Sequence, residues 1–306
     1  MKLTLICLCA VLCDRLVEEP RRWHPLTGFI WLAQQLEAVC YGPSELKISL
    51  RLLLGALALL LMIVPAALLA WKLAAVPYLG VVAEGGLLYL SLQAAGLERH
   101  ARAVAKALQD KDLQQARAQV SRLVSRDTQE LGEEELSLAL VEAVLKRGCT
   151  GTLGALFWFL VAGAPGVVVY RLVTVLDGLW GYPTPRYRYF GQATACLNDA
   201  LNWLPARLTA LSYALVGDRE TAWRCWREQA SAWRGVNTGP LLAAGAGALN
   251  LQLGGVVRYY DREVARPALG EGLLPRRRDI ERVVNLVNWS MGLWIVLLFL
   301  GEWWLV

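Results

Sequence analysis

The sequence predicts an all-helical, polytopic integral membrane bundle with a cytoplasmic amphipathic segment and a broken or re-entrant helix. Hydrophobic residues make up 56% of its 306 residues and charged residues only 19%, a balance that soluble domains rarely show. The apolar residues come in long blocks, as membrane-crossing helices require. Four of the tryptophans bracket the last apolar run, where an interfacial aromatic belt is expected and core packing is the alternative. We therefore treat residues 1–306 as one membrane domain.

The N-terminal third contains three apolar segments. Residues 3–13 have a length that fits a signal-peptide core or a short membrane helix, and the charged Asp14 after them suits the end of a retained helix better than a cleavage site. Residues 52–71 carry no charge and are long enough to cross a hydrocarbon core, with Pro65 as an expected kink. Residues 77–97 are predicted to return across the membrane, so that the two segments form a helical hairpin.

Residues 99–150 hold much of the charge and are expected in the cytoplasm. Arg51 lies at one outer end of the predicted hairpin and several basic residues follow its other end, which is the pattern of the positive-inside rule. Asp112 is predicted to cap a first amphipathic helix, in which apolar residues recur at helical spacing. A second helix is predicted to begin near Glu133, since a cluster of acids suits a helix N-terminus.

The second half of the chain contains four further apolar stretches. Residues 153–180 are interrupted at Gly-Ala-Pro-Gly 163–166, which predicts either a broken helix that lines a cavity or a kinked structural helix. Residues 197–217 form an apolar helix that carries charges, and residues 240–255 are rich in Gly and Ala, as in close helix packing or a re-entrant element. The final helix is expected at about 285–306.

Composition and motifs exclude several classes of protein. The seven cysteines contain no C-x-x-C pair and are expected as buried apolar residues in a reduced environment, and two histidines argue against a multi-histidine metal site. The net charge of +5 comes from Lys and Arg beside apolar runs, so no nucleic-acid partner is expected. Phosphate-loop, nucleophile-elbow and H-E-x-x-H signatures are absent from the sequence.

Polar residues at the membrane boundaries are the candidates for a functional site. Carboxylates at the cytoplasmic mouth of a bundle could hold Mg²⁺, which takes a few protein oxygens together with substrate phosphates. Arginines could bind phosphate or carboxylate groups through paired hydrogen bonds. Interfacial anchoring explains each residue singly. The candidates are Asp14, His24, Arg126, Asp127, Glu142, Asp177, Asp199 and Arg207.

A series of short motifs follows one order along the chain. They are Asp14, Pro20, Trp23-His24-Pro25, Leu123 to Thr128, Val141-Glu142, Ala155 to Trp158, Leu176-Asp177, Gly181-Tyr182, Tyr187-Arg188, Asn202 to Leu208, Ala246 to Leu249 and Gly254-Gly255. In this order they resemble the CobD/CbiB family of cobalamin biosynthesis membrane enzymes, over nearly the whole chain. The resemblance implies adenosylcobinamide-phosphate synthase activity, in which ATP and Mg²⁺ activate a carboxylate of adenosylcobyric acid and aminopropanol or its phosphate attacks to form an amide.

The resemblance also implies roles for single residues. The catalytic candidates are Asp14, His24, Asp127, Glu142, Asp177 and Asp199, of which Asp127, Asp177 and Asp199 would bind Mg²⁺. The candidates for binding substrate phosphates are Arg126, Thr128, Arg207 and Asn237.

The chain also departs from the family pattern at several polar positions. After Val141-Glu142 the family has Ala-Glu-Asn-Thr-Val-Asp-Gly, and this chain has Leu-Lys-Arg-Gly-Cys-Thr-Gly at 145–151, so that both acids and the amide are lost. This exchange reverses the local charge that a Mg²⁺–ATP site needs. Further departures are Thr174-Val175 for Asn-Thr, Asn198 for the first acid of an Asp-Asp pair, and Trp233 and Leu242 for a later histidine and glutamate.

Three interpretations follow from matches and departures together. The first is an ATP-dependent amide ligase of the cobalamin pathway in the bacterial inner membrane, with a corrinoid substrate. The second is a non-catalytic membrane regulator or scaffold resembling AmpE, a relative linked to cell-wall and β-lactamase signalling, with no cofactor. The third is a related ligase in which Lys146 and Arg147 hold an anionic group in place of the metal. The lipid bilayer is the partner expected in each case, together with either a second copy or a membrane partner protein.

Overall fold

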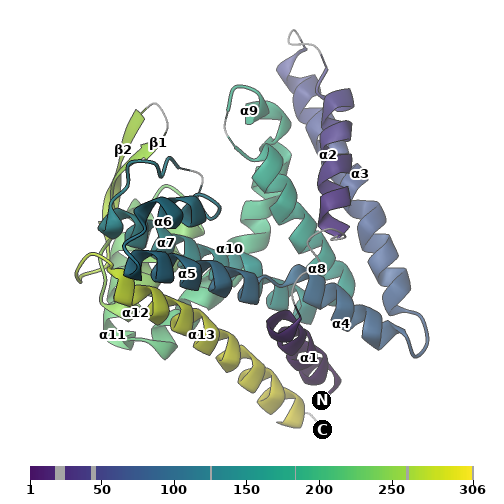
Figure 1. Ribbon diagram of the computed structural model, residues 1–306. Helices are drawn as coiled ribbons and strands as arrows, with labels where there is room; N and C mark the ends of the chain where they lie inside the picture. The colour runs from purple at the N-terminus through teal and green to yellow at the C-terminus, as the bar shows by residue number, and fades with distance from the viewer. Residues whose placement is uncertain (18–24, 43–45, 125, 183, 260–261, 305–306) are drawn as a thin grey trace. The chain divides into compact units, whose positions relative to one another are not determined.

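The computed structural model describes the chain except for residues 18–24, 43–45, 125, 183, 260–261 and 305–306, and it is mostly helical (Figure 1). Four helical stretches within the described residues are long and apolar enough to cross a membrane: Ile48–Ala74, Gly80–Gln109, Glu133–Trp180 and Arg277–Trp304. The protein is therefore a multi-pass, helical membrane protein, as its apolar blocks predict. The residues divide into two units, which are Met1–Leu92 with Gly154–Asn202, and Gln93–Leu153 with Trp203–Val306.

The first unit packs helices around a small aromatic and aliphatic core. Its elements are α1 (Lys2–Leu16), α2 (Pro25–Cys40), α3 (Ile48–Ala74), α4 (Gly80–Ser91), α8 (Gly154–Trp180), α9 (Tyr187–Phe190) and the first part of α10 (Gln192–Val216). Helices α3 and α8 pack against one another, and Leu59 and Ile63 of α3 share a buried cluster with Leu176 and Trp180 of α8. The ring of Phe190 meets Trp180 edge-on, with centroids 5.3 Å apart.

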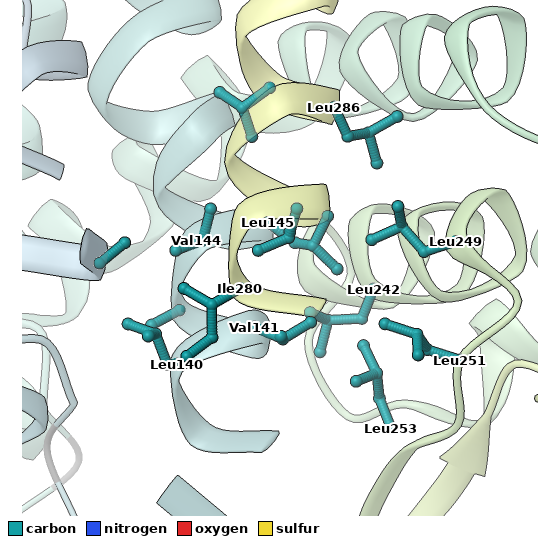
Figure 2. Close-up of a cluster of buried hydrophobic side chains, with 14 of the residues drawn as sticks. Leu140, Val141, Val144, Leu145, Leu242, Leu249, Leu251, Leu253, Ile280 and Leu286 are labelled. Atoms are coloured by element: carbon teal, nitrogen blue, oxygen red, sulfur yellow. The ribbon is translucent and has the colours of Figure 1, made fainter. Parts of the chain in front are cut away.

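The second unit combines helices with a two-stranded antiparallel sheet. Its elements are α5 (Ala94–Gln109), α6 (Leu113–Val120), α7 (Glu133–Gly148), the π-helix η1 (Cys149–Leu153), the rest of α10, α11 (Arg219–Gln229), the 3₁₀ turn η2 (Ala230–Ala232), α12 (Thr238–Leu249), β1 (Leu253–Tyr259), β2 (Arg262–Leu269) and α13 (Arg277–Trp304). Figure 2 shows its core, where Leu140, Val141, Val144 and Leu145 of α7 lie among side chains of α12, α13 and the chain around β1. Helix α7 is therefore the central, buried helix of this unit.

Several local predictions are confirmed. Helix α7 begins at Glu133, and the Asp112 carboxylate caps α6 by accepting a hydrogen bond of 2.9 Å from the backbone N–H of Gln115. Helix α3 contains Pro65. The interruption in α8 is also present, because Ala162 and Gly163 depart from helical geometry.

Three element boundaries differ from the predictions. The helix predicted over 77–97 is broken, since α4 ends at Ser91 and the backbone N–H of Gln93 donates to the carbonyl of Gly151 at 2.9 Å. The final helix begins at Arg277 and not near 285, because Asp279 accepts from the backbone N–H of Arg276 and so caps the helix earlier. The β1–β2 hairpin is strand where a packed or re-entrant run was expected up to 255.

Candidate functional site

A pocket of about 250 Å³ in the second unit brings together two of the candidate residues, Arg126 and Glu142. Helix α7 supplies one wall, the segment after α6 a second, and the start of α12 with strand β2 the others. The lining residues are Leu123, Val124, Arg126, Ala139, Glu142, Ala143, Lys146, Trp233, Thr238, Leu242 and Arg266.

A buried ion pair lies at the centre of this pocket. Arg266 donates from both terminal nitrogens to the Glu142 carboxylate, at 2.9 Å to Oε2 and 2.9 Å to Oε1. The Arg126 guanidinium lies 3.8 Å from the same carboxylate. The side chains of Arg126, Glu142 and Arg266 are only 7%, 11% and 12% exposed, so water screens these charges weakly. One carboxylate therefore lies within ion-pair distance of two arginines.

The hairpin geometry positions Arg266 and completes the hydrogen bonds of Glu142. The register between β1 and β2 shifts between Leu253 and Gly255, which marks a bulge. Gly254 in this bulge has φ +95°, and a Cβ there would collide with the carbonyl of Pro267, so only glycine fits. Its backbone N–H donates to Glu142 Oε1 at 3.1 Å. The Gly-Gly motif is thus part of the site.

The remaining lining residues make the pocket suited to an anion. Lys146 lies one helical turn after Glu142 on α7 and is exposed at the pocket. The Arg266 guanidinium lies 5.1 Å from the centroid of the Trp233 ring, a cation–π distance that holds it in place. Three cationic side chains, Arg126, Lys146 and Arg266, line the pocket beside one carboxylate, a lining that suits a phosphate or carboxylate group of a ligand.

Asp127 and Thr128 lie beside this pocket but have local hydrogen bonds. The Asp127 carboxylate accepts from the backbone N–H of Gln129 at 2.9 Å, and the Thr128 hydroxyl donates to the carbonyl of Arg117 at 3.2 Å. Together with Arg126 they line a second, more open pocket of about 620 Å³ against α6. Arg126 thus borders both pockets.

Arg207 and Asn237 come together in the second unit. Arg207 donates to the carbonyl of Trp203 at 2.7 Å and to the side-chain oxygen of Asn237 at 3.3 Å, and its guanidinium lies 4.2 Å from the centroid of the Trp203 ring. Asn237 is the residue that precedes α12, next to the pocket residue Thr238. The two predicted phosphate-binding residues are therefore neighbours.

Asp177 belongs to a polar chain within the first unit. Asn198 donates to the Asp177 carboxylate at 2.9 Å, Asn202 donates to the side-chain oxygen of Asn198 at 3.0 Å, and the Tyr170 hydroxyl donates to Asn202 at 2.8 Å. This chain links α8 to α10. Asn198, which replaces a family acid, donates a hydrogen bond that a carboxylate could not donate.

Three further candidate residues were predicted from the sequence. Asp14 is buried on α1, Asp199 is exposed on α10, and His24 lies outside the described residues. The predicted Mg²⁺ ligands Asp177 and Asp199 belong to the first unit and Asp127 to the second. Among the described residues, no group of three or more His, Cys, Asp or Glu side chains is arranged to hold a metal ion.

The pocket around Glu142 does not fit a resident Mg²⁺ ion. Its single carboxylate has both oxygens engaged by Arg266, and three cationic side chains line the same space. Mg²⁺ prefers a site with carboxylate and water oxygens and without competing cations. The donor set therefore fits the anionic groups of a substrate.

Arg266 was not predicted from the sequence. Nor did the sequence show that residues which depart from the family pattern lie in the same pocket as Arg266. Lys146, Trp233 and Leu242 all line this pocket. The alternation of Val, Arg and Glu residues on both sides of Tyr259 to Arg262 is a hairpin signal that would have pointed to Arg266. These three departures thus lie together in the second unit, whereas Thr174, Val175 and Asn198 belong to the first unit.

The helices and the pocket define a class of protein: a multi-pass helical membrane protein with an arginine-lined anion pocket. A family described as CobD/Cbib protein matches residues 7–287. Cobalamin biosynthesis protein CobD of Chromobacterium violaceum is 49% identical over 290 residues, which cover 94% of this chain and 93% of the relative. No solved structure matches the chain significantly.

Two further relatives carry the same name. Cobalamin biosynthesis protein CobD of Stutzerimonas stutzeri is 46% identical and covers 99% of both chains. That of Mycobacterium tuberculosis is 33% identical over 91% of this chain and 89% of its own. The chain belongs to the CobD/CbiB family, as its ordered motifs predict. These comparisons give no support to the AmpE-like alternative.

Proposed function

We propose that this protein acts in cobalamin biosynthesis as an ATP-dependent amide ligase of the inner membrane. It would join aminopropanol or its phosphate to a carboxylate of adenosylcobyric acid. Family membership and the names of the relatives support the pathway. The observation that carries the proposal is the buried cluster of Arg126 and Arg266 around Glu142, with Lys146 beside it.

Negatively charged phosphate groups take part in both steps of this reaction, the activation of the carboxylate and the formation of the amide. An amine does not displace oxygen from a carboxylate, so a carboxylate oxygen would first attack the γ-phosphate of ATP, ADP would leave, and the oxygen would become part of a phosphate leaving group. The amine nitrogen would then attack the carbonyl carbon, phosphate would leave, and the nitrogen would lose a proton to water. Arginine and lysine side chains can stabilise the charge on phosphoryl groups in such steps. A pocket of about 250 Å³ has room for phosphate groups, not for a corrin ring.

The direct test is product formation by the purified, full-length protein. The protein in detergent micelles would receive adenosylcobyric acid, Mg²⁺, ATP and aminopropanol phosphate, and the amide would be detected by mass spectrometry. A reaction without ATP and a reaction with an active relative are the two controls. No amide in the complete mixture, with product from the relative, would contradict the ligase and favour a non-catalytic role.

Lys146→Gln tests which anion the pocket holds. We expect KM for one phosphorylated substrate to rise about fivefold with a smaller effect on kcat, because one charge-assisted contact to phosphate is lost. A rise for ATP assigns the pocket to the nucleotide. A rise for aminopropanol phosphate, without one for aminopropanol, assigns it to the amine substrate. Lys106→Gln, an exposed lysine on α5, is the matched control. Unchanged KM values for ATP and for aminopropanol phosphate would show that Lys146 contacts neither substrate.

We also propose that residues 99–150 lie on the cytoplasmic side, where ATP is available. Arg99, Arg102 and Lys106 carry the positive-inside signal. A green fluorescent protein inserted after Gly132, between α6 and α7, is expected to fluoresce. Alkaline phosphatase at the same position is expected to be inactive. The reverse result would place the pocket on the other side of the membrane.

A further inference from the structure

A second large groove lies in the same unit, away from the Glu142 pocket. It has a volume of about 850 Å³ and is formed by the end of α10 and one face of α11. The lining residues are Leu211, Ala214, Leu215, Arg219, Glu220, Trp223, Arg224, Arg227 and Glu228. None of them is among the candidate residues of the ligase.

Contacts with α13 place this groove at the membrane boundary. The indole N–H of Trp294, in the apolar half of α13, donates to the hydroxyl of Ser212 at 2.8 Å. Ser212 is the neighbour of Leu211, so the apolar wall of the groove lies at the level of the membrane-crossing part of α13. Arg282, near the polar start of α13, donates to the carbonyl of Leu249 at 2.7 Å.

The start of α11 lies at the polar end of this arrangement. The backbone N–H of Asp218 donates to the carbonyl of Ala248 at 3.0 Å, next to the Leu249 carbonyl that Arg282 contacts. Asp218 caps α11 through the backbone N–H of Thr221 at 3.1 Å. The groove therefore runs from the apolar level of Leu211 to the polar level of α11.

The side chains of the groove follow the same order. Leu211, Leu215 and Trp223 are 38%, 51% and 47% exposed, which is costly in water and normal against lipid. Trp223 is the type of residue that favours the interface. Arg219 and Arg227 lie one turn on either side of Trp223 along α11 and are exposed. The groove thus has an apolar wall at Leu211 and Leu215, and α11 adds the ring of Trp223 and the two cations.

Arg224 is already engaged, and two cations remain for a ligand. Arg224 donates to both oxygens of Glu271, at 2.9 and 2.6 Å, and this hydrogen bonding holds the pKa of the Glu271 carboxyl below its ordinary value. Among the described residues, no ion pair is formed by Arg219 or Arg227. Glu220 and Glu228 add two carboxylates to the same lining.

We propose that this groove binds a phospholipid whose headgroup carries a primary ammonium, such as phosphatidylethanolamine. Its phosphate would lie between Arg219 and Arg227, its ammonium near Glu220 or Glu228, and one acyl chain along Leu211 and Leu215. The mixed charges favour such a headgroup over glycerol, which would offer the Glu220 and Glu228 carboxylates no cation beyond Arg224, whose guanidinium lies 4.0 Å from Glu220. The bound lipid would fix α11 at the membrane surface. This inference is independent of the ligase activity.

The test is lipid binding to delipidated, full-length protein, followed by native mass spectrometry. Phosphatidylethanolamine is expected to bind the wild type, and the double variant Arg219→Gln with Arg227→Gln is expected to bind it about fivefold more weakly. The matched control is Arg99→Gln with Arg234→Gln, which removes two exposed arginines outside the groove. Equal affinity in both double variants would overturn the proposal.

Two further arms separate the alternatives. Phosphatidylglycerol that binds as tightly as phosphatidylethanolamine would overturn the headgroup assignment. If the wild type is a dimer and the groove variant is a monomer, the groove binds a second copy of the chain and not a lipid. Quenching of tryptophan fluorescence by phosphatidylethanolamine with brominated acyl chains should decrease in Trp223→Phe. Unchanged quenching would place the lipid elsewhere, whatever the result of the amide-forming assay.

Discussion

Glu142→Ala is expected to destabilise the protein by about 3–5 kcal/mol, because it leaves two buried arginines without their shared counter-charge. Arg126 and Arg266 are only 7% and 12% exposed, so water cannot replace the carboxylate. The backbone N–H of Gly254 also loses its acceptor. The measurement is the apparent unfolding temperature of the detergent-solubilised protein, followed by circular dichroism. Product formation should be lost as well.

The control and the double variant separate stability from function. Glu134→Gln removes an exposed carboxylate from the same helix and should cost at most about 1 kcal/mol. Replacing the pair by Glu142→Leu with Arg266→Met should recover part of the stability, since apolar residues often replace a buried ion pair well. Amide formation should not recover in this variant. A Glu142→Ala protein as stable as Glu134→Gln would show that the cluster is not important for the fold.

Much of the fold could be predicted because its signals are local. The uncharged run of α3, the acidic start of α7 and the Asp112 cap of α6 each lie within one stretch of sequence. The break between α4 and α5 could not be predicted this way. It depends on the hydrogen bond from Gln93 to Gly151, and these residues are far apart in the sequence.

In the candidate site, too, residues with a local sequence signal were predicted and a residue placed by non-local pairing was not. Arg126 and Glu142 were recognised through their motifs, and the structure brings them together. Arg266 forms the closer pair with Glu142, but it stands on a strand whose position depends on pairing with β1 and on the bulge at Gly254. Strand pairing is non-local, and the glycine and proline content of this region weakens its strand signal.

The fold also shows that two departures from the family pattern, which are far apart in the sequence, lie in one pocket. The sequence shows Lys146 and Trp233 as separate losses of family polar residues. In the structure both line one pocket with Arg266, and Trp233 lies against that arginine. Replacement of an acid by a cation and of a histidine by an aromatic ring in one pocket indicates a changed electrostatic environment, which suits an anion.

Gly247→Ala is expected to destabilise the protein by about 1–3 kcal/mol or more, because α11 and α12 touch at this glycine. A Cβ at position 247 would lie 2.6 Å from the Cα of Ala222 and 2.7 Å from the carbonyl oxygen of Thr221. Both are backbone atoms, so the helices themselves must separate. Lipid binding at α11 should weaken with them.

Two other glycines calibrate this effect in the same unit. At Gly245 the nearest atoms belong to the Leu145 side chain, which can rotate, so Gly245→Ala should cost less than Gly247→Ala. At Gly292, inside α13, a Cβ meets nothing within 4 Å. Alanine there should be neutral or stabilise by up to about 1 kcal/mol, since it favours the helix over glycine. Apparent unfolding temperatures in the order Gly292→Ala, Gly245→Ala, Gly247→Ala, from highest to lowest, would confirm that the α11–α12 contact is set by backbone approach. A Gly247→Ala protein as stable as Gly292→Ala would contradict it.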